Sequence, residues 1–273
     1  MKKFDLKNID FKNMDKRRVM LIVIGVLCIA IALYGLFDIF MDYKLSDDTY
    51  NEVVQEFVMI NTGGTGESDN VPWYEMISVD LTGLQQNYAD VVGWIFFEDG
   101  SISYPVVHGK DNNQYLHTTY DGKQAKAGSI FLEATHNPDF SDTHTLIYGH
   151  NMGNLSMFGR LKYYRADKEY YNGREYFQIH TGNEILRYKI FAYQHLEEDS
   201  FIFQEYFSSG KDLAKRLRAG SMRKVDIDIE EDDKIVNLST CTVDDKFRFV
   251  VSAVLVEKYS LTDNALIIDE TKE

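Results

Sequence analysis

The stretch KIVNLSTCTVDDKFRFVV, residues 234–251, contains two β-branched and aromatic runs joined by a short polar loop. Such runs are typical of β-strands, and the loop suits an antiparallel pair. In that pairing Cys241 closes the first strand and Arg248 opens the second. Residues that face each other across antiparallel strands have Cβ atoms about 4.5–5.5 Å apart. The pattern therefore predicts that a thiol and a guanidinium meet at one rim of a sheet.

This pairing has a chemical meaning because the chain has only two cysteines, and the other, Cys28, lies in an apolar run near the N-terminus. A nearby cation lowers the pKa of a thiol and favours the nucleophilic thiolate. The planar guanidinium is also suited to a developing oxyanion. The alternatives are that Cys241 is a small buried hydrophobe and that Arg248 forms a surface ion pair. A nucleophilic cysteine usually needs an acid/base group as well.

Seven histidines could supply that group. We favour His150, because TLIYGHNM places it in a glycine-containing turn directly after a buried strand, where functional side chains are often held. His180 alternates along a strand and is predicted to be structural. His117, His136 and His144 are predicted to be loop residues. Loop histidines are commonly just solvated, so the hypothesis of a catalytic His150 depends on the presence of Cys241 and Arg248.

The fold is predicted from eight short apolar runs that begin at residue 93 and are bounded by Gly, Asn and Asp. The segment TGN, 181–183, predicts a hairpin turn, and helical spacing over 45–60 and 79–90 predicts two N-terminal helices. Between the sixth and seventh runs, residues 197–222 contain a predicted helix with Leu213 and Leu217 on one face. The prediction is a mainly β protein built on an eight-stranded barrel. The eight runs are GWIFFE, YPVVH, GSIFL, HTLIYG, EYFQIHT, EILRYKIFAYQHL, KIVNLST and FRFVVSAVLVEKY.

The N-terminal part is predicted to hold the protein in a membrane. Residues 19–37 form an uncharged run that, at about 1.5 Å per residue, nearly spans a bilayer core. Three basic residues precede it and no small-residue cleavage site follows it, which favours a retained signal anchor with a cytoplasmic N-terminus. We expect a cytoplasmic tail over 1–18, a single-pass transmembrane anchor over 19–41, a stalk over 42–79 and an extracytoplasmic catalytic domain over 80–273. A buried core helix is the alternative.

The net charge of −14 excludes several functions. The first 45 residues carry eight Lys or Arg and five Asp, so the remainder is strongly acidic and unsuited to nucleic acid. The acidic run DIDIEEDD, 226–233, matches no EF-hand spacing and is predicted to be a solvated loop. No His/Cys cluster has zinc-ligand spacing. We expect neither metal nor cofactor.

The motifs LIYGHNM…MFGRL, LSTC and RFVV, in this order, resemble those of the sortases, cysteine transpeptidases of Gram-positive cell surfaces. The resemblance covers about residues 80–260, and class B is most similar. YPVVHGKDNNQYL and GSIFL resemble its early strands, and the helical insert between strands six and seven is its distinguishing feature. The loop between Cys241 and Arg248 is short for class B, and we expect this departure to alter how the groove receives its substrate.

The resemblance implies roles for individual residues. Cys241 would be the nucleophile, His150 the general acid/base, and Arg248 the oxyanion and substrate clamp. The expected peptide-groove residues are Tyr148, Ser239, Thr240 and Asn112. The implied partners are secreted proteins with a C-terminal sorting signal, and peptidoglycan or its lipid-linked precursor as the amine acceptor. The sorting motif would be cleaved after a threonine.

Other functions remain open from the sequence. A pilin-polymerising sortase would use a lysine of a neighbouring subunit as acceptor, and a cysteine peptidase would release the acyl group to water. A catalytically silent surface module would only bind peptide. The insert aromatics Phe203, Tyr206 and Phe207 could cover the core or form a groove wall.

Overall fold

The computed structural model describes residues 15–61, 71–241 and 246–268, with the side chain of Cys241 outside this description. Most of the predicted loop over 242–247, most of the linker over 61–70 and most of the N-terminal tail lie outside the described residues. The chain divides into two compact units, residues 1–44 and residues 45–273.

Helix α1, Lys16–Phe57, contributes to both units. In the first unit its large apolar side chains are exposed, and the helix is long and apolar enough to cross a membrane. In the second unit its last turns bury one face, which carries Tyr50, Val53 and Phe57. The Tyr50 hydroxyl donates to the Gly128 carbonyl at 2.6 Å, which fastens this end of the helix to the globular unit.

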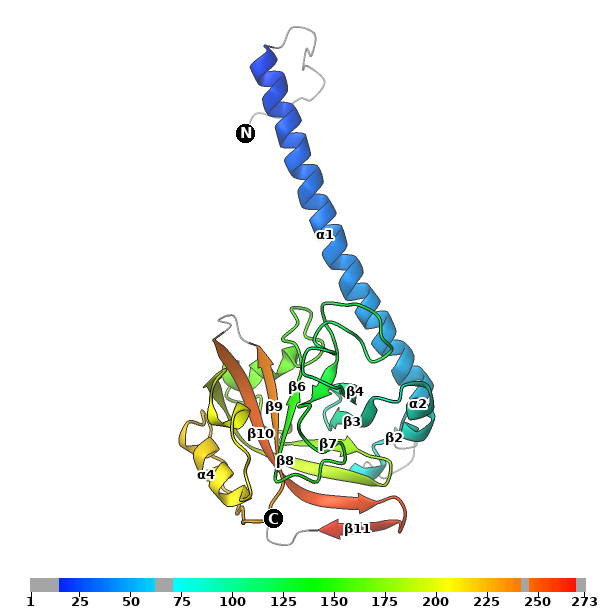
Figure 1. Ribbon diagram of the computed structural model, residues 1–273, viewed down its shortest axis with the longest axis vertical. Helices are drawn as coiled ribbons and strands as arrows, with labels where there is room; N and C mark the ends of the chain where they lie inside the picture. Colours follow the sequence, from blue (N-terminus) through cyan, green and yellow to red (C-terminus); the bar gives the residue numbers. More distant parts are fainter. Residues whose placement is uncertain (1–14, 62–70, 242–245, 269–273) are drawn as a thin grey trace. The chain divides into compact units, whose positions relative to one another are not determined.

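Within the described residues of the second unit, eight strands close into a barrel in the order β10-β8-β7-β3-β4-β5-β6-β9, with β9 returning to β10 (Figure 1). The pairs β4–β5 and β6–β9 are parallel, and the other barrel pairs are antiparallel. The strands are β3 Val91–Phe97, β4 Ser103–His108, β5 Ile130–Leu132, β6 His144–Tyr148, β7 Tyr176–His180, β8 Glu184–Glu197, β9 Ile235–Cys241 and β10 Phe247–Ser260. Each predicted run forms one of them, so the barrel prediction is confirmed.

Strand β10 closes the barrel because it pairs with β8 along one edge and with β9 along the other. Its length also leaves room for a second neighbour on the β9 edge. Residues 248–254 pair with β9, whereas residues 257–260 pair with the short strand β11, Ala265–Ile268. The predicted hairpin at 181–183 joins β7 to β8. Two small strands missed by the prediction, β1 Val58–Ile60 and β2 Ile77–Val79, pair with each other outside the barrel. The remaining short elements are η3 Trp73–Glu75, α2 Leu81–Asn87, η4 Gly159–Lys162 and α3 Tyr163–Ala166.

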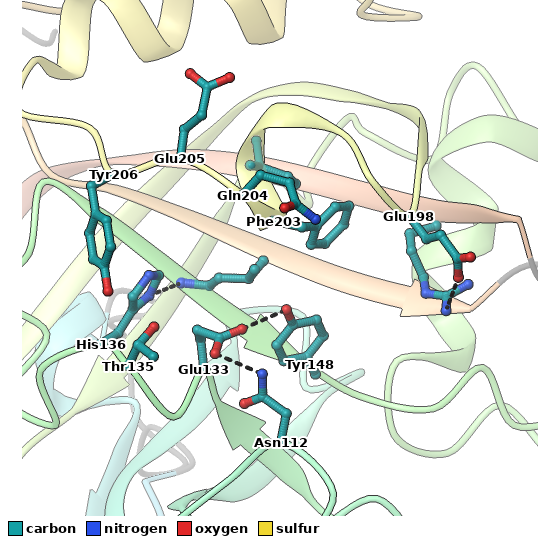
Figure 2. Close-up of a pocket in the computed structure, with 13 residues that line it drawn as sticks. Asn112, Glu133, Thr135, His136, Tyr148, Glu198, Phe203, Gln204, Glu205 and Tyr206 are labelled. Carbon is teal, nitrogen blue, oxygen red and sulfur yellow. Dashed lines mark hydrogen bonds and ion pairs between the residues drawn. The ribbon is translucent and has the colours of Figure 1, made fainter.

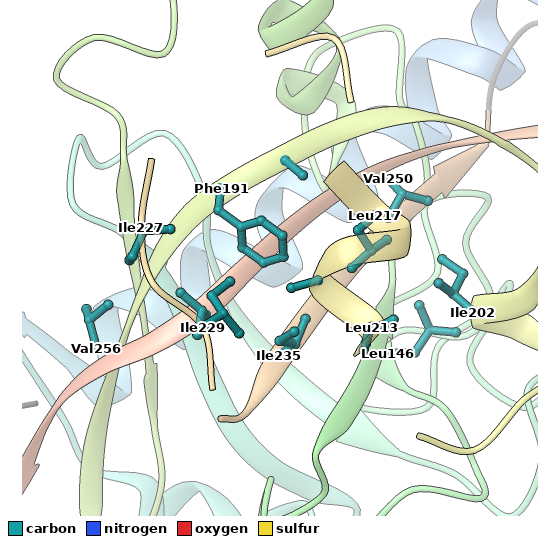
Figure 3. Close-up of a cluster of buried hydrophobic side chains, with 13 residues drawn as sticks. Leu146, Phe191, Ile202, Leu213, Leu217, Ile227, Ile229, Ile235, Val250 and Val256 are labelled. Atoms are coloured by element: carbon teal, nitrogen blue, oxygen red, sulfur yellow. The ribbon is translucent and has the colours of Figure 1, made fainter. Parts of the chain in front are cut away.

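The insert between β8 and β9 contains η5, Phe201–Phe203, and α4, Gly210–Ala219. The Ser209 hydroxyl caps α4 by accepting from the Asp212 N–H at 3.0 Å. The predicted apolar face, with Leu213 and Leu217, is fully buried against the barrel. These side chains meet residues of β6, β8, β9 and β10 (Figure 3). The barrel side of this contact is formed by Leu146, Phe191, Ala192, Ile235, Val250, Val254 and Val256.

Insert and barrel are thus one hydrophobic unit. The loop before α4 is held by Arg216, which pairs with Glu205 at 2.6 Å and lies 4.0 Å from the Phe201 ring centroid. Residues of this loop line a pocket together with residues of β6 and β10, so the insert forms part of the surface near the predicted site.

Candidate active site

The register of β9 and β10 places Cys241 and Arg248 directly opposite each other. This is the juxtaposition predicted from the spacing within residues 234–251. The Arg248 side chain is 24% exposed, and its Nη2 donates to Glu198 Oε2 at 3.3 Å. Glu198 begins the insert, so the insert contacts the arginine side of the hairpin.

The parallel pairing of β6 with β9 brings His150 to the same rim. Tyr148 lies opposite Ser239, and the next N–H along, that of Gly149, donates to the Ser239 carbonyl at 3.1 Å. A Cβ on Gly149 would stand 2.7 Å from the Phe158 ring, so this turn has no room for a side chain. Glycine is required here because the chain turns tightly against the core before reaching His150.

His150 is held by the loop that contains residues 109–117. Its Nε2 lies 2.6 Å from the Leu116 carbonyl, and its ring stacks on His117 with centroids 5.4 Å apart. Because a carbonyl can only accept, Nε2 carries the proton and Nδ1 is left as the other ring nitrogen for chemistry. Burial lowers the pKa of His150, the neighbouring His117 lowers it further, and the bond to Leu116 partly opposes them.

One pocket of about 210 Å³ brings together six of the seven residues predicted for the site. The seventh, Cys241, lies in the register position opposite Arg248. Ser239 and Thr240 are buried, and their hydroxyls have no hydrogen-bond partner among the described residues. The lining consists of Asn112, Leu116, Phe131, Tyr148, Gly149, His150, Ser239, Thr240 and Arg248.

A second pocket, of about 490 Å³, adjoins the first and shares Asn112, Tyr148 and Arg248 with it (Figure 2). Its remaining lining comes from the residues after β5, from β6 and from the insert. Phe203 and Tyr206 line this pocket, and Phe207 packs against the insert core and the His144 ring. The insert aromatics therefore do both things that the sequence left open: some form a wall of the pocket, and Phe207 helps to cover the hydrophobic core.

Sequence reasoning missed several residues of this region. Glu133 lies between Asn112 and Tyr148, and Glu198 contacts Arg248. A carboxylate directly after the buried run GSIFL was the available signal for Glu133. The loop assignment of His144 is wrong, because His144 begins β6 and its side chain is buried. Among the described residues no group of three or more His, Cys, Asp or Glu side chains is placed to hold a metal ion.

The closed eight-stranded barrel, with this hairpin and histidine turn at one rim, matches the fold that the resemblance to the sortases implies. Comparison with known proteins agrees with that resemblance, because residues 97–256 match the family described as the sortase domain. The chain belongs to the sortase family, whose members are cysteine transpeptidases.

Its relatives lie in class B. Sortase B of Listeria monocytogenes is 33% identical over 185 residues, which cover 66% of this chain and 75% of the relative. The crystal structure of sortase B from Bacillus anthracis in complex with AAEK1 is 29% identical, with a TM-score of 0.65, and covers 80% of this chain and 99% of that one. A Streptococcus pyogenes class B sortase involved in pilus biogenesis is 30% identical, with a TM-score of 0.58, and covers 65% of this chain and 98% of that one.

Proposed function

We propose that this sortase is a membrane-anchored transpeptidase that cleaves a C-terminal sorting motif after threonine and transfers the protein to a peptidoglycan amine. The proposal rests on one observation: the strand register sets Cys241 opposite Arg248, while His150 and Arg248 line the same small pocket. These three residue types supply a nucleophile, an oxyanion donor and a proton carrier.

The first half-reaction forms the acyl-enzyme. The thiolate of Cys241 attacks the threonine carbonyl carbon, and the oxygen takes the negative charge of a tetrahedral intermediate. Arg248 donates to that oxygen. The C–N bond then breaks, and the departing amine takes a proton from His150, which we assign to Nδ1 because Leu116 occupies Nε2. The product is a thioester on Cys241.

The second half-reaction releases the protein. An amine attacks the thioester carbonyl, gives its proton to His150, and the C–S bond breaks to regenerate the thiolate. Ser239, Thr240, Tyr148 and Asn112 line the smaller pocket and are proposed to hold the peptide during both steps. Lowering of the His150 pKa by burial means that the protonated imidazole is a minor form at neutral pH. The protonated form needed in the first step is therefore scarce.

The test is a quenched peptide carrying a threonine sorting motif, incubated with the soluble ectodomain with and without an amine acceptor. Ligation that depends on both Cys241 and the amine supports transfer. Cleavage at the same rate without ligation, in the presence of saturating amine, supports a peptidase instead. If Cys241→Ala turns over as fast as the wild-type protein, the proposal is wrong.

A second acceptor has one observation in its favour, since the similar Streptococcus pyogenes enzyme is involved in pilus biogenesis. In that case the attacking amine would be a lysine side chain of a pilin subunit. Competition between a peptidoglycan stem peptide and a lysine-containing pilin peptide in the ligation assay distinguishes the two acceptors.

We propose the same membrane arrangement as the sequence predicts, with residues 1–18 as the cytoplasmic tail, 19–41 as the anchor, 42–79 as the stalk and 80–273 as the catalytic domain. The support is that α1 is long and apolar enough to cross a bilayer and that basic residues precede its apolar part. Protease added to intact cells should digest the C-terminal domain, and protection of that domain would reverse the topology.

A further inference from the structure

Glu133 is a half-buried carboxylate that the chemistry above does not use. It follows β5 directly, and its N–H donates to the Leu146 carbonyl at 2.9 Å, which holds its backbone against β6. The side chain lines the larger pocket and lies beside the boundary with the smaller one. Its position is therefore set by the barrel.

Both carboxylate oxygens of Glu133 are engaged by residues of the pocket boundary. Oε1 accepts from Asn112 Nδ2 at 2.7 Å, and Oε2 accepts from the Tyr148 hydroxyl at 2.8 Å. Figure 2 shows the carboxylate between these two side chains. Hydrogen bonds to an ionised acceptor are shorter and stronger than neutral ones. Glu133 therefore connects the loop of Asn112 to the end of β6.

The same contacts limit where Asn112 and Tyr148 can move. Asn112 Oδ1 accepts from the Ala134 N–H at 2.9 Å, so its amide is held at both ends by adjacent residues. The Tyr148 ring stacks on Phe131 with centroids 5.1 Å apart, and Phe203 of the insert lies 6.5 Å away on a nearly parallel plane. With the ring and the hydroxyl both held, Tyr148 has one position between the two pockets.

We propose that Glu133 is a positioning residue, which sets the wall of Tyr148 and Asn112 between the two pockets before the sorting peptide binds. This inference rests on the proposed function, since it assumes that the peptide lies along that wall. Burial and the Glu133 charge raise the pKa of Tyr148, which keeps its hydroxyl a donor toward the carboxylate. A pre-set wall lowers the ordering cost of binding, so its loss weakens binding more than chemistry.

Two other roles make different predictions. A merely structural Glu133 would change thermal stability without changing the Michaelis constant of the folded enzyme. A Glu133 that contacts the substrate directly would act independently of Tyr148. The positioning role requires that the effects of Glu133 and Tyr148 overlap, because one acts through the other.

The kinetic test compares three variants, Glu133→Ala, Tyr148→Phe and the double variant. The substrate is a threonine-containing peptide chosen because the wild-type ectodomain cleaves it. We expect Glu133→Ala to raise KM about tenfold with kcat within about threefold of wild type, as for lost uniform binding. In the Tyr148→Phe background the same substitution should raise KM by clearly less than about tenfold, because only the bond between Glu133 and Asn112 is left to lose. Fully multiplicative effects, or an unchanged KM in folded Glu133→Ala, would overturn the proposal. Glu184→Gln, at the β7–β8 hairpin, is the matched control outside both pockets.

Two measurements separate this proposal from the proposed function. In a Cys241→Ala background, which cannot turn over, fluorescence anisotropy of the labelled peptide should show about tenfold weaker binding for Glu133→Ala. In peptide-free Glu133→Ala, hydrogen exchange at the Ala134 amide should be faster than in the wild-type protein, because the Asn112 oxygen that accepts from this amide is released. Unchanged exchange at the Ala134 amide in Glu133→Ala refutes the positioning role, even if the wild-type enzyme turns the peptide over normally. If Glu133→Ala shows faster exchange but the wild-type protein shows no turnover that depends on Cys241, the positioning role is supported and the proposed chemistry is refuted.

Discussion

Replacement of Arg248 tests the central geometry most directly. Arg248 is the register partner of Cys241 across an antiparallel pair. Such partners generally have Cβ atoms about 4.5–5.5 Å apart. Loss of one oxyanion donor commonly lowers kcat by about 10²–10³. The ion pair with Glu198 adds little to this, because the Glu198 side chain is 60% exposed and such pairs contribute at most about 1 kcal/mol. We therefore expect Arg248→Ala to lower kcat by about 10²–10³.

The design separates charge from geometry. Arg248→Lys retains the positive charge but not the planar fork, so it should recover at most about tenfold of the loss. Because the donor acts on charge that forms in the transition state, kcat and kcat/KM should fall together. Initial rates of the peptide ligation assay measure both quantities, and a melting curve shows that the variant is folded.

The matched control is Arg174→Ala, which removes an arginine paired with Asp99 at 2.7 Å and outside both pockets. It should keep kcat within about twofold of wild type, as expected for a surface ion pair. A folded Arg248→Ala enzyme with a kcat within about tenfold of wild type would refute the oxyanion role. A full rescue by lysine would show that charge alone is sufficient.

Three further predictions concern stability and pH. Leu217→Ala should lower the free energy of unfolding by about 3 kcal/mol because Leu217 is fully buried on the face of α4 that packs against the barrel. Urea denaturation measures this, and a loss below about 1 kcal/mol, no larger than for exposed Lys215→Ala, would contradict the packing. His117→Gln should raise the pKa of His150, because His117 lowers it by repulsion. The limb of the pH–rate profile assigned to His150 should then move to higher pH, and a move to lower pH would contradict this repulsion. Burial lowers the pKa of His180 to about 4. Its unfolded form binds a proton near pH 6.5, so the free energy of unfolding should fall as pH decreases from about 6.5 to about 4, by about 1.4 kcal/mol per pH unit. His180→Gln should reduce that slope, and an unchanged slope in urea titrations would refute the assignment.

The sequence by itself determined the eight barrel strands of this protein and the hairpin at its site. Strands alternate side chains on a two-residue period, and short loops join antiparallel neighbours, so KIVNLST and FRFVVSAV could be paired from local pattern alone. Their register then followed, and with it the opposition of Cys241 and Arg248. The insert helix was predictable for a similar reason, because Leu213 and Leu217 share one face of a helix.

Only the tertiary structure decided which groups from distant segments share the pocket. Asn112 and Glu133 are 21 residues apart, yet their side chains meet because β4 and β5 pair in parallel and return the chain to the same rim. His150 reaches that rim through the parallel pairing of β6 with β9, which no local spacing encodes. Parallel pairings join strands through long connections, so they are determined by packing of the whole barrel rather than by any short stretch of sequence.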